Sequence, residues 1–149
     1  MYHEEQDSAY ALFSQIIRFH YHRMHILLDK LGLYPGQPGV LFILGKQSGQ
    51  SQKELAEKLH IKAGTVAVML NRMEKAQLIE RHQDQSDQRI SRVYLTKHGE
   101  MVRDQVKEAF KTIETECFKD FTTEEQVLLR RLFMQMRDNL RKLCDKNSD

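Results

Sequence analysis

Three histidines near the N-terminus, His20, His22 and His25, have a side-chain type that could bind a metal ion. His22 and His25 share one face of a predicted helix, whereas His20 points away from them at about 100° per residue. Arg18 and Asp29 lie one turn to either side of the pair. Two imidazoles and one carboxylate fall short of the four ligands of a structural zinc site, and no Cys–His spacing adds to them. We interpret the pair as part of a polar helix face or of a dimer-contact surface, and we predict no metal.

The sequence contains no motif that is typical of catalysis. It has no G-x-S-x-G, P-loop, G-x-G-x-x-G or H-E-x-x-H pattern, and its carboxylates are dispersed along predicted helix faces. Two cysteines, Cys117 and Cys144, cannot form a disulfide framework. Cys117 falls on an apolar stripe, which favours a buried, inert thiol. We therefore expect a protein that is not an enzyme, has no cofactor and resides in a reducing, cytoplasmic compartment.

Positive charge is concentrated in the middle of the chain. The formal net charge of the whole sequence is only +2, but residues 51–98 carry nine basic and six acidic side chains, and the remainder has a charge of −1. A basic surface favours a polyanionic partner such as DNA. An excess of this size is ordinary for a solvated surface. It matters because it coincides with a structural motif in the same stretch.

The two flanking segments, residues 8–31 and 100–145, are predicted to be long amphipathic helices. All seven Gly and both Pro lie between them, and both segments carry apolar side chains at helical spacing. The apolar face of such a helix needs a cover. Burial within one monomer is the alternative, but the middle of the chain is able to form its own core, which leaves apolar stripes to spare. We predict dimerisation helices of an intertwined homodimer.

Capping signals mark where these helices begin and end. Asp7 or Ser8 can cap the first helix, and Gly32 ends it. Thr122 and Glu125 have the spacing of a capping box. This box divides the C-terminal segment into two helices.

Residues 35–98 are predicted to hold three short helices followed by a β-hairpin. A second capping box begins at Ser51, and residues 60–62 connect the second helix to the third. Two short helices joined by such a turn form a helix-turn-helix, and the hairpin after them forms a wing. The predicted helices span 35–46, 51–59 and 63–76, and the predicted strands span 78–81 and 90–95, with a polar turn at 82–89.

The whole chain, residues 1–149, is predicted to be a single domain that is mainly α-helical with a small β-hairpin wing. Its length and its 40% apolar composition suit one domain with a sizeable core. The longest apolar runs have five residues, and a membrane span needs about 20. The N-terminus lacks the pattern of a signal peptide. We expect a soluble protein without a membrane partner.

Several motifs together point to a known family. They are Ser51-Gln-Lys-Glu-Leu-Ala-Glu-Lys-Leu59, Thr65-Val66, Leu70, Arg72-Met-Glu74, Leu78-Ile-Glu-Arg81, Asp84, Asp87-x-Arg89, and Val93-x-Leu-Thr96 followed by Gly99. On these motifs the sequence resembles the MarR family of winged helix-turn-helix transcription regulators. The order of a helix, a winged core and two long helices extends the resemblance over about residues 8–145.

The resemblance implies a homodimer that binds double-stranded DNA at a palindromic operator. Each subunit would place a recognition helix in the major groove and a wing arginine in the minor groove. Many members of the family are repressors that are released by small anionic aromatic ligands, by oxidants or by metals. We therefore expect a dimeric, sequence-specific DNA-binding regulator, a repressor released by a chemical signal. The alternatives are a winged-helix protein-interaction module without DNA binding and a zinc-responsive regulator.

The resemblance also assigns residues to a DNA interface. Ser51 and Gln52 open the supporting helix, where side chains and backbone N–H groups suit a phosphate. Thr65 offers a hydroxyl and a methyl group to base edges. Arg89 is the wing arginine, and Asp87 braces either the wing tip or the guanidinium. The full set is Ser51, Gln52, Lys62, Ala63, Gly64, Thr65, Val68, Asn71, Arg72, Arg89 and Arg92.

Two positions on the recognition helix, and one just after it, leave alternatives open or depart from the family pattern. Arg72 can contact a phosphate, or it can pair with Glu74 or Asp87 instead. Val68 stands where the family often has arginine, so a common base-reading contact is missing. Gln77 replaces the glycine often found where the recognition helix ends. The operator sequence therefore does not follow from the resemblance.

An effector pocket is implied between the dimer helices and the winged core, as in relatives that respond to ligands. Arg18 or His20 would meet a small anionic aromatic effector there. The expected lining residues are Ile17, Arg18, His20, Tyr21, Met24 and Phe42.

Overall fold

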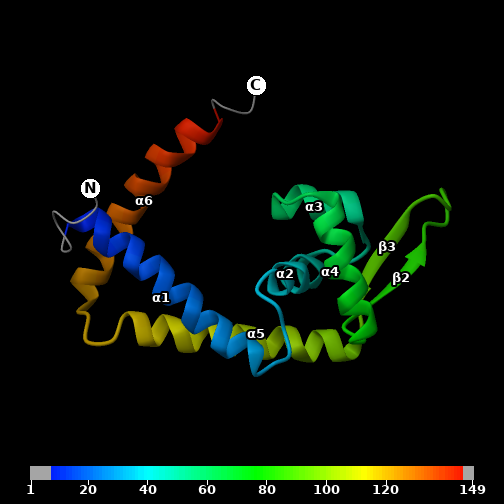
Figure 1. Cartoon of the computed structure of the whole chain (residues 1–149), viewed down its shortest axis with the longest axis horizontal. Coiled ribbons are helices and arrows are strands. Elements are labelled where there is room, and N and C mark those ends of the chain that lie inside the picture. Colours follow the sequence, from blue (N-terminus) through cyan, green and yellow to red (C-terminus); the bar gives the residue numbers. More distant parts are fainter. Residues whose placement is uncertain (1–7, 146–149) are drawn as a thin grey trace. The chain divides into compact units, whose positions relative to one another are not determined.

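The computed structural model describes residues 8–145, which form six helices and three short strands. Figure 1 labels the helices and the hairpin strands β2 and β3. Asp7, one of the two candidate caps, lies outside the described residues. The chain divides into two compact units between Ile113 and Glu114. The elements are α1 (Ala9–Asp29), α2 (Gln37–Lys46), β1 (Gln50–Ser51), α3 (Gln52–Leu59), α4 (Ala63–Lys75), β2 (Ile79–Gln83), β3 (Ser91–Leu95), α5 (Lys97–Cys117) and α6 (Thr123–Asp145).

Helix α1 begins and ends close to the predicted positions. The amide of Ala11 donates to Ser8 Oγ at 3.1 Å, so Ser8 is the N-cap. Beyond the helix the chain turns through Gly32, whose φ of +69° lies in the left-handed region that favours glycine. Leu28, near the end of α1, is buried in the core of the first unit. Earlier in the helix, Ile16 and several other apolar side chains are exposed.

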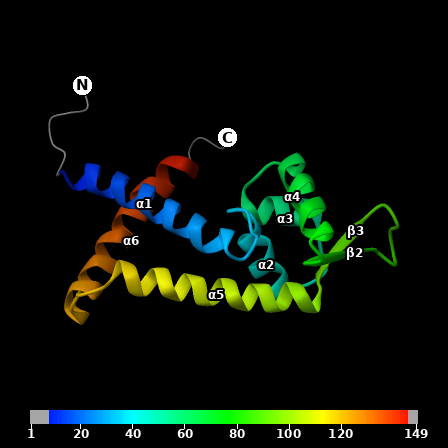
Figure 2. The same cartoon turned by 60° about the horizontal axis from the view of Figure 1, so that its bottom comes forward.

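Helices α2, α3 and α4 lie together near the beginning of α5 (Figure 2), and each contributes buried side chains to the core of the first unit. Leu41 of α2, Leu55 of α3 and Leu70 of α4 are each 0% exposed. Burial of a leucine side chain stabilises the fold by about 1.5–3 kcal/mol relative to exposure. Val102 and Val106 bring the first half of α5 into the same cluster. The middle of the chain therefore supplies most of this core, and Leu28 of α1 and the two valines of α5 complete it.

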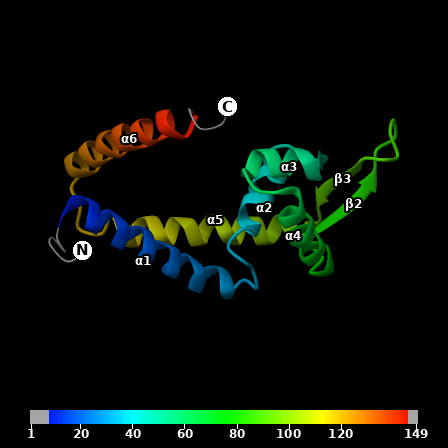
Figure 3. The ribbon, with the colours of Figure 1, turned by 45° about the horizontal axis from the view of Figure 1, so that its top comes forward.

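The wing is part of a three-stranded antiparallel sheet with the order β1-β3-β2. Strands β2 and β3 pair over five positions, from Ile79 opposite Leu95 to Gln83 opposite Ser91. The sequence pattern predicted this hairpin but not β1, which has only two residues. The hairpin extends away from helices α2, α3 and α4 (Figure 3).

The connection from the recognition helix through the wing to α5 contains two close contacts. Gln77, where the family often has glycine, has a φ of 58°, so its backbone is left-handed. Its carbonyl oxygen accepts the hydroxyl of Thr96 at 2.6 Å, and that hydroxyl oxygen accepts the amide of Gly99 at 2.9 Å. A Cβ atom on Gly99 would lie 2.0 Å from the backbone oxygen of Leu78. Only glycine fits at this position without a shift of the backbone.

Helix α6 lies in the second unit. The predicted capping box is confirmed, since the amide of Glu125 donates to Thr122 Oγ1 at 3.1 Å and the amide of Thr122 donates to Glu125 Oε2 at 2.9 Å. No described side chain of α6 is buried in the chain. Cys117, at the end of α5, is exposed, so the expectation of a buried thiol is wrong for the single chain. Among the described residues, no helix has the length and apolar character needed to cross a membrane.

Candidate nucleic-acid interface

The start of the supporting helix α3 is fixed by its capping box. The amide of Glu54 donates to Ser51 Oγ at 3.2 Å, and the amide of Ser51 donates to Glu54 Oε2 at 2.7 Å. The pKa of Glu54 lies below its ordinary value, chiefly because the carboxylate accepts this backbone hydrogen bond. The Ser51 hydroxyl therefore already acts as the N-cap of α3 within the protein. Gln52 Nε2 donates to the carbonyl oxygen of Ala63 at 3.2 Å and so joins α3 to the start of α4.

One face of the recognition helix α4 is exposed over its first three turns. The chain enters α4 through His60, whose φ is 55°, and Lys62 occupies the N-cap position without a capping hydrogen bond from its side chain. Buried side chains hold the opposite face of the helix in the core. The exposed residues from the expected DNA interface on this helix and its cap are Lys62, Ala63, Gly64, Thr65, Val68, Asn71 and Arg72.

Arg72 takes neither of the two pairings that the sequence analysis left open. Its guanidinium carbon lies 5.0 Å from the centre of the Tyr34 ring, a cation–π arrangement. Glu74 instead pairs with Arg81 of β2 at 3.0 Å, and Arg81 also donates to the side-chain oxygen of Asn71. No sequence signal connects Tyr34 with Arg72, because only the packing of α4 beside the segment before α2 brings them together.

A cavity of about 370 Å³ opens beside this arginine, on the exposed side of α4. Its walls combine the Tyr34 ring, apolar side chains and the start of the recognition helix. The lining residues are Tyr34, Gln37, Gly64, Thr65, Val68, Met69 and Arg72.

Two carboxylates shape the tip of the wing. Asp84 Oδ2 accepts the amides of Ser86 at 3.1 Å and Asp87 at 3.0 Å, and Asp87 Oδ1 accepts the amide of Arg89 at 3.0 Å. Asp87 thus braces the backbone of the tip rather than the guanidinium. The Arg89 side chain is exposed and makes no hydrogen bond or ion pair with residues 8–145, the part of the chain that the structure describes.

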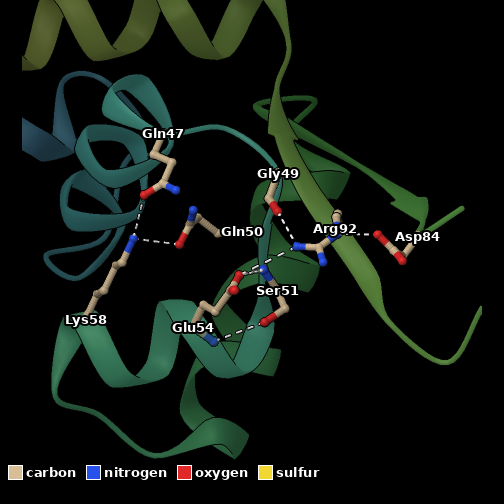
Figure 4. Close-up of polar contacts among 8 residues, drawn as sticks. All are labelled: Gln47, Gly49, Gln50, Ser51, Glu54, Lys58, Asp84 and Arg92. Carbon is tan, nitrogen blue, oxygen red and sulfur yellow. Dashed lines mark hydrogen bonds and ion pairs between the residues drawn. The ribbon is translucent and has the colours of Figure 1, made fainter. Parts of the chain in front are cut away.

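Arg92 differs from Arg89 because its guanidinium is already bonded within the protein (Figure 4). Its Nε donates to Asp84 Oδ1 at 2.6 Å, and its Nη1 donates to the carbonyl oxygen of Gly49 at 2.9 Å. The same nitrogen lies 3.8 Å from Glu54 Oε2. The Asp84 bond is the main reason that the pKa of Arg92 is raised and the pKa of Asp84 is lowered. Arg92 was expected to bind DNA, but in this structure it connects parts of the protein.

The residues expected to line an effector pocket do not share one environment within the chain. Met24 and Phe42 pack against the core, and the rings of Phe42 and Phe110 lie 5.3 Å apart. The other four, Ile17, Arg18, His20 and Tyr21, lie on the exposed surface of α1. Within residues 8–145, no three His, Cys, Asp or Glu side chains gather as metal ligands.

An exposed recognition helix, a supporting helix that is bonded to it and a hairpin with a basic tip define a winged helix-turn-helix protein. Residues 33–91 match the model of the MarR family. The uncharacterised HTH-type transcriptional regulator YwoH of Bacillus subtilis (strain 168) is 31% identical over 106 residues, which are 71% of this chain and 77% of YwoH. The chain belongs to the MarR family, whose members are transcription regulators rather than enzymes.

Further similarities extend over most of the chain. The HTH-type transcriptional repressor MdtR of Bacillus subtilis (strain 168) is 32% identical over 68% of this chain, but the match spans only 64% of MdtR. The crystal structure of MarR is 27% identical, with a TM-score of 0.76 over 98% of this chain and 99% of that one. The transcriptional repressor CouR, solved with a 23-mer DNA duplex, has a TM-score of 0.77 over 92% of this chain and 97% of its own. Its 20% identity shows the fold alone.

Proposed function

We propose that the protein is a homodimeric repressor that binds a palindromic operator with helix α4 and the wing, and that a small effector releases it. The main support for DNA binding is the Arg89 side chain, which is exposed at the tip of the wing. The start of α4 is exposed in the same unit. A guanidinium fits the narrow, negative minor groove of A·T tracts. CouR, which has the same fold, was solved with a DNA duplex, and this supports DNA binding by the fold. The name of MdtR supports a repressor.

Within the recognition helix, Thr65 is the side chain that we propose reads a base. It is exposed in the first turn, where its hydroxyl and methyl groups are able to reach the groove floor. Thr65→Ala is expected to lose discrimination at one base position per half-site, at a cost of about 1–3 kcal/mol. Equal weakening on all sequences would assign Thr65 to a phosphate instead.

The dimer is proposed from the apolar surface that each chain leaves uncovered. Ile16 of α1 is 56% exposed, and Leu128 of α6 is 53% exposed. Large apolar faces of this kind mark an interface. In a two-fold dimer, paired recognition helices would meet successive major grooves about 34 Å apart, which requires an operator with two half-sites.

We propose that an effector acts through this spacing requirement. A ligand bound among α1 residues such as Arg18 and Tyr21 and core residues such as Met24 would change the separation of the two recognition helices. By linkage, the effector must then bind the DNA-free dimer more tightly than the DNA-bound dimer. Titration of aromatic anions, oxidants and zinc against the operator complex tests this. If none of them alters affinity, the result favours an unliganded repressor that is controlled by its own abundance.

The test of DNA binding begins with selection of duplex fragments by the purified protein, followed by affinity measurements over a range of salt. Arg89→Ala should weaken operator binding and reduce the slope of log affinity against log salt by about 0.9 per subunit. Lys107→Ala, which removes one exposed positive charge from α5, is the matched control and should leave the slope unchanged. An unchanged slope in Arg89→Ala would mean that the wing does not touch DNA. No salt-dependent binding by the wild type would favour a protein-interaction module.

A further inference from the structure

The side chain of Arg92 joins three parts of the winged unit that lie apart in the sequence (Figure 4). Toward the wing loop it bonds to Asp84 at 2.6 Å, and toward the turn before β1 it bonds to the backbone of Gly49 at 2.9 Å. It also faces Glu54 of α3 at 3.8 Å. Its side chain is 31% exposed, so it lies in the surface layer rather than extending into solvent. A planar guanidinium with five N–H donors suits such a junction, whereas a lysine ammonium does not.

Asp84 is the end of this junction that belongs to the wing. One of its carboxylate oxygens accepts Arg92, and the other accepts the amides of Ser86 and Asp87. The carboxylate is only 19% exposed, and its pKa is lowered first by the Arg92 bond and then by the Asp87 amide. The loop that carries Arg89 is therefore fastened to Arg92 through one side chain.

Glu54 is the end that belongs to the helix-turn-helix. It closes the capping box of α3 through the amide of Ser51. Gln52, the residue after Ser51, donates to the carbonyl oxygen of Ala63 in the first turn of α4. A chain of contacts thus runs from the wing loop through Arg92 to the beginning of the recognition helix.

The backbone by itself holds the wing only at its base. Strand β1 pairs with β3 at two positions, Gln50 with Val93 and Ser51 with Arg92, and the wing loop lies beyond them. From there outward the hairpin is a two-stranded ribbon, which twists more strongly than a wider sheet and has little stability of its own. A side chain that connects the loop to the start of α3 therefore restricts a motion that the strands leave open.

We propose that Arg92 is a positioning residue that fixes the wing relative to the recognition helix, so that Arg89 and α4 meet the same duplex. The inference rests on the DNA binding proposed above. It assigns Arg92 no DNA contact and makes Asp84 its functional partner.

Asp84→Asn distinguishes positioning from DNA contact, because the two roles predict different changes. Asparagine keeps an oxygen for the loop amides but loses the charged bond to Arg92. If Arg92 positions the wing, Asp84→Asn and Arg92→Ala each lower operator affinity by about threefold to tenfold. If Arg92 contacts DNA, Asp84→Asn leaves affinity unchanged or raises it, because a negative charge near DNA has been removed. Asp104→Asn on α5, another carboxylate paired with an arginine, controls for the charge.

A double-mutant cycle with Arg89 tests whether Arg92 acts through the wing. If it does, adding Arg92→Ala to Arg89→Ala changes affinity by less than about twofold, because the wing contact is already lost. Arg92→Lys, which keeps the charge but not the planar set of donors, should not restore wild-type affinity. Additive losses, or full rescue by lysine, would overturn the proposal in favour of a direct phosphate contact.

Amide hydrogen exchange of the DNA-free protein, followed by NMR, separates this proposal from the proposed function. In Arg92→Ala the amides of Ser86 and Asp87 should exchange about threefold to tenfold faster, while amides in the second half of α4 keep their rates. Unchanged exchange in the wing overturns the positioning role. If exchange changes as expected but the wild type binds no duplex, the proposed function fails, and the docking role of Arg92 fails with it.

Discussion

Helices α4 and α6 carry the same kind of apolar spacing but have opposite environments. In α4, Val66, Leu70 and Met73 are each 0% exposed, whereas in α6 Leu128 is 53% and Leu132 39% exposed. The period of apolar residues defines a helix and the face that requires a cover. It does not define whether that cover comes from the same chain. An apolar face that is buried within the chain and one that binds a second copy therefore have the same sequence pattern, and only tertiary packing distinguishes them.

The two helices differ in burial because α4 packs against more elements of the same chain than α6 does. Helix α4 packs among elements that are close along the chain, and it shares one cluster with Leu41 of α2, Leu55 of α3 and Ile79 of β2. Helix α6 has an equally apolar side and no buried described residue. Under the proposed dimer, a second copy supplies the missing cover.

The largest expected effect is a loss of stability when the core around α4 is disrupted. Leu70→Ala removes a fully buried side chain and should lower the free energy of unfolding by about 2–5 kcal/mol. Urea denaturation followed by circular dichroism measures this. Val68 lies on the same helix but is 53% exposed. Val68→Ala is therefore the matched control and should change stability by less than about 0.5 kcal/mol. Equal effects of the two variants would remove the contrast within α4.

A charge on the apolar side of α6 should act on assembly instead. Leu132→Glu would place an unpaired carboxylate in the proposed interface, and we expect the dimer dissociation constant to rise at least about a hundredfold. Sedimentation equilibrium measures the constant. Gln135→Glu adds the same charge three residues further along α6 and controls for charge alone. A wild-type monomer, or an undisturbed Leu132→Glu dimer, would contradict the proposed role of α6.

The two capping boxes offer a smaller and more direct comparison. In a Leu132→Glu background, Ser51→Ala should lower the free energy of unfolding by about 1 kcal/mol. Thr122→Ala should cost less there, because a helix that lacks tertiary packing contributes little stability for its cap to protect. Urea denaturation of both double variants provides the measurement. An equal cost for both caps would show that α6 is stable without a partner.

The smallest expected effect is the response of the winged unit to acid. The pKa of Glu54 lies below its ordinary value of 4.5, mainly through the Ser51 amide, so its contribution is complete above that value and is lost as pH falls through the folded pKa. The loss should be small because the group is largely exposed to water. Glu54→Gln keeps the capping acceptor and should flatten the dependence of stability on pH below 5, and Glu57→Gln on the same helix is the charge control. An unchanged acid slope in Glu54→Gln would contradict this origin.

Local signals account for much of the fold that was predicted. The capping boxes at Ser51 and Thr122 and the glycine stop at Gly32 act within a few residues, so a sequence pattern describes them completely. The hairpin was found for the same reason. Strand β1 was missed because two residues carry no period, and its pairing depends on Val93, more than 40 positions away.

In the candidate site, too, some features follow from local sequence and others only from tertiary packing. The exposed positions of Thr65 and Arg89 follow from their places at a helix start and a loop tip. The partners of Arg72 and Arg92 do not, since Tyr34 and Gly49 reach them only through packing of separate elements.

The sequence by itself determined the helices, the wing, their caps and the polar and apolar faces, because each arises from contacts between near neighbours. Tertiary structure alone decided which arginines are bonded within the protein and which apolar faces the chain itself covers. Arg89 and Arg92 are three positions apart in one hairpin, yet one is exposed at the tip and the other is bonded to Asp84 and Gly49. A side chain's partners are set by elements distant in sequence, whose approach no local pattern records.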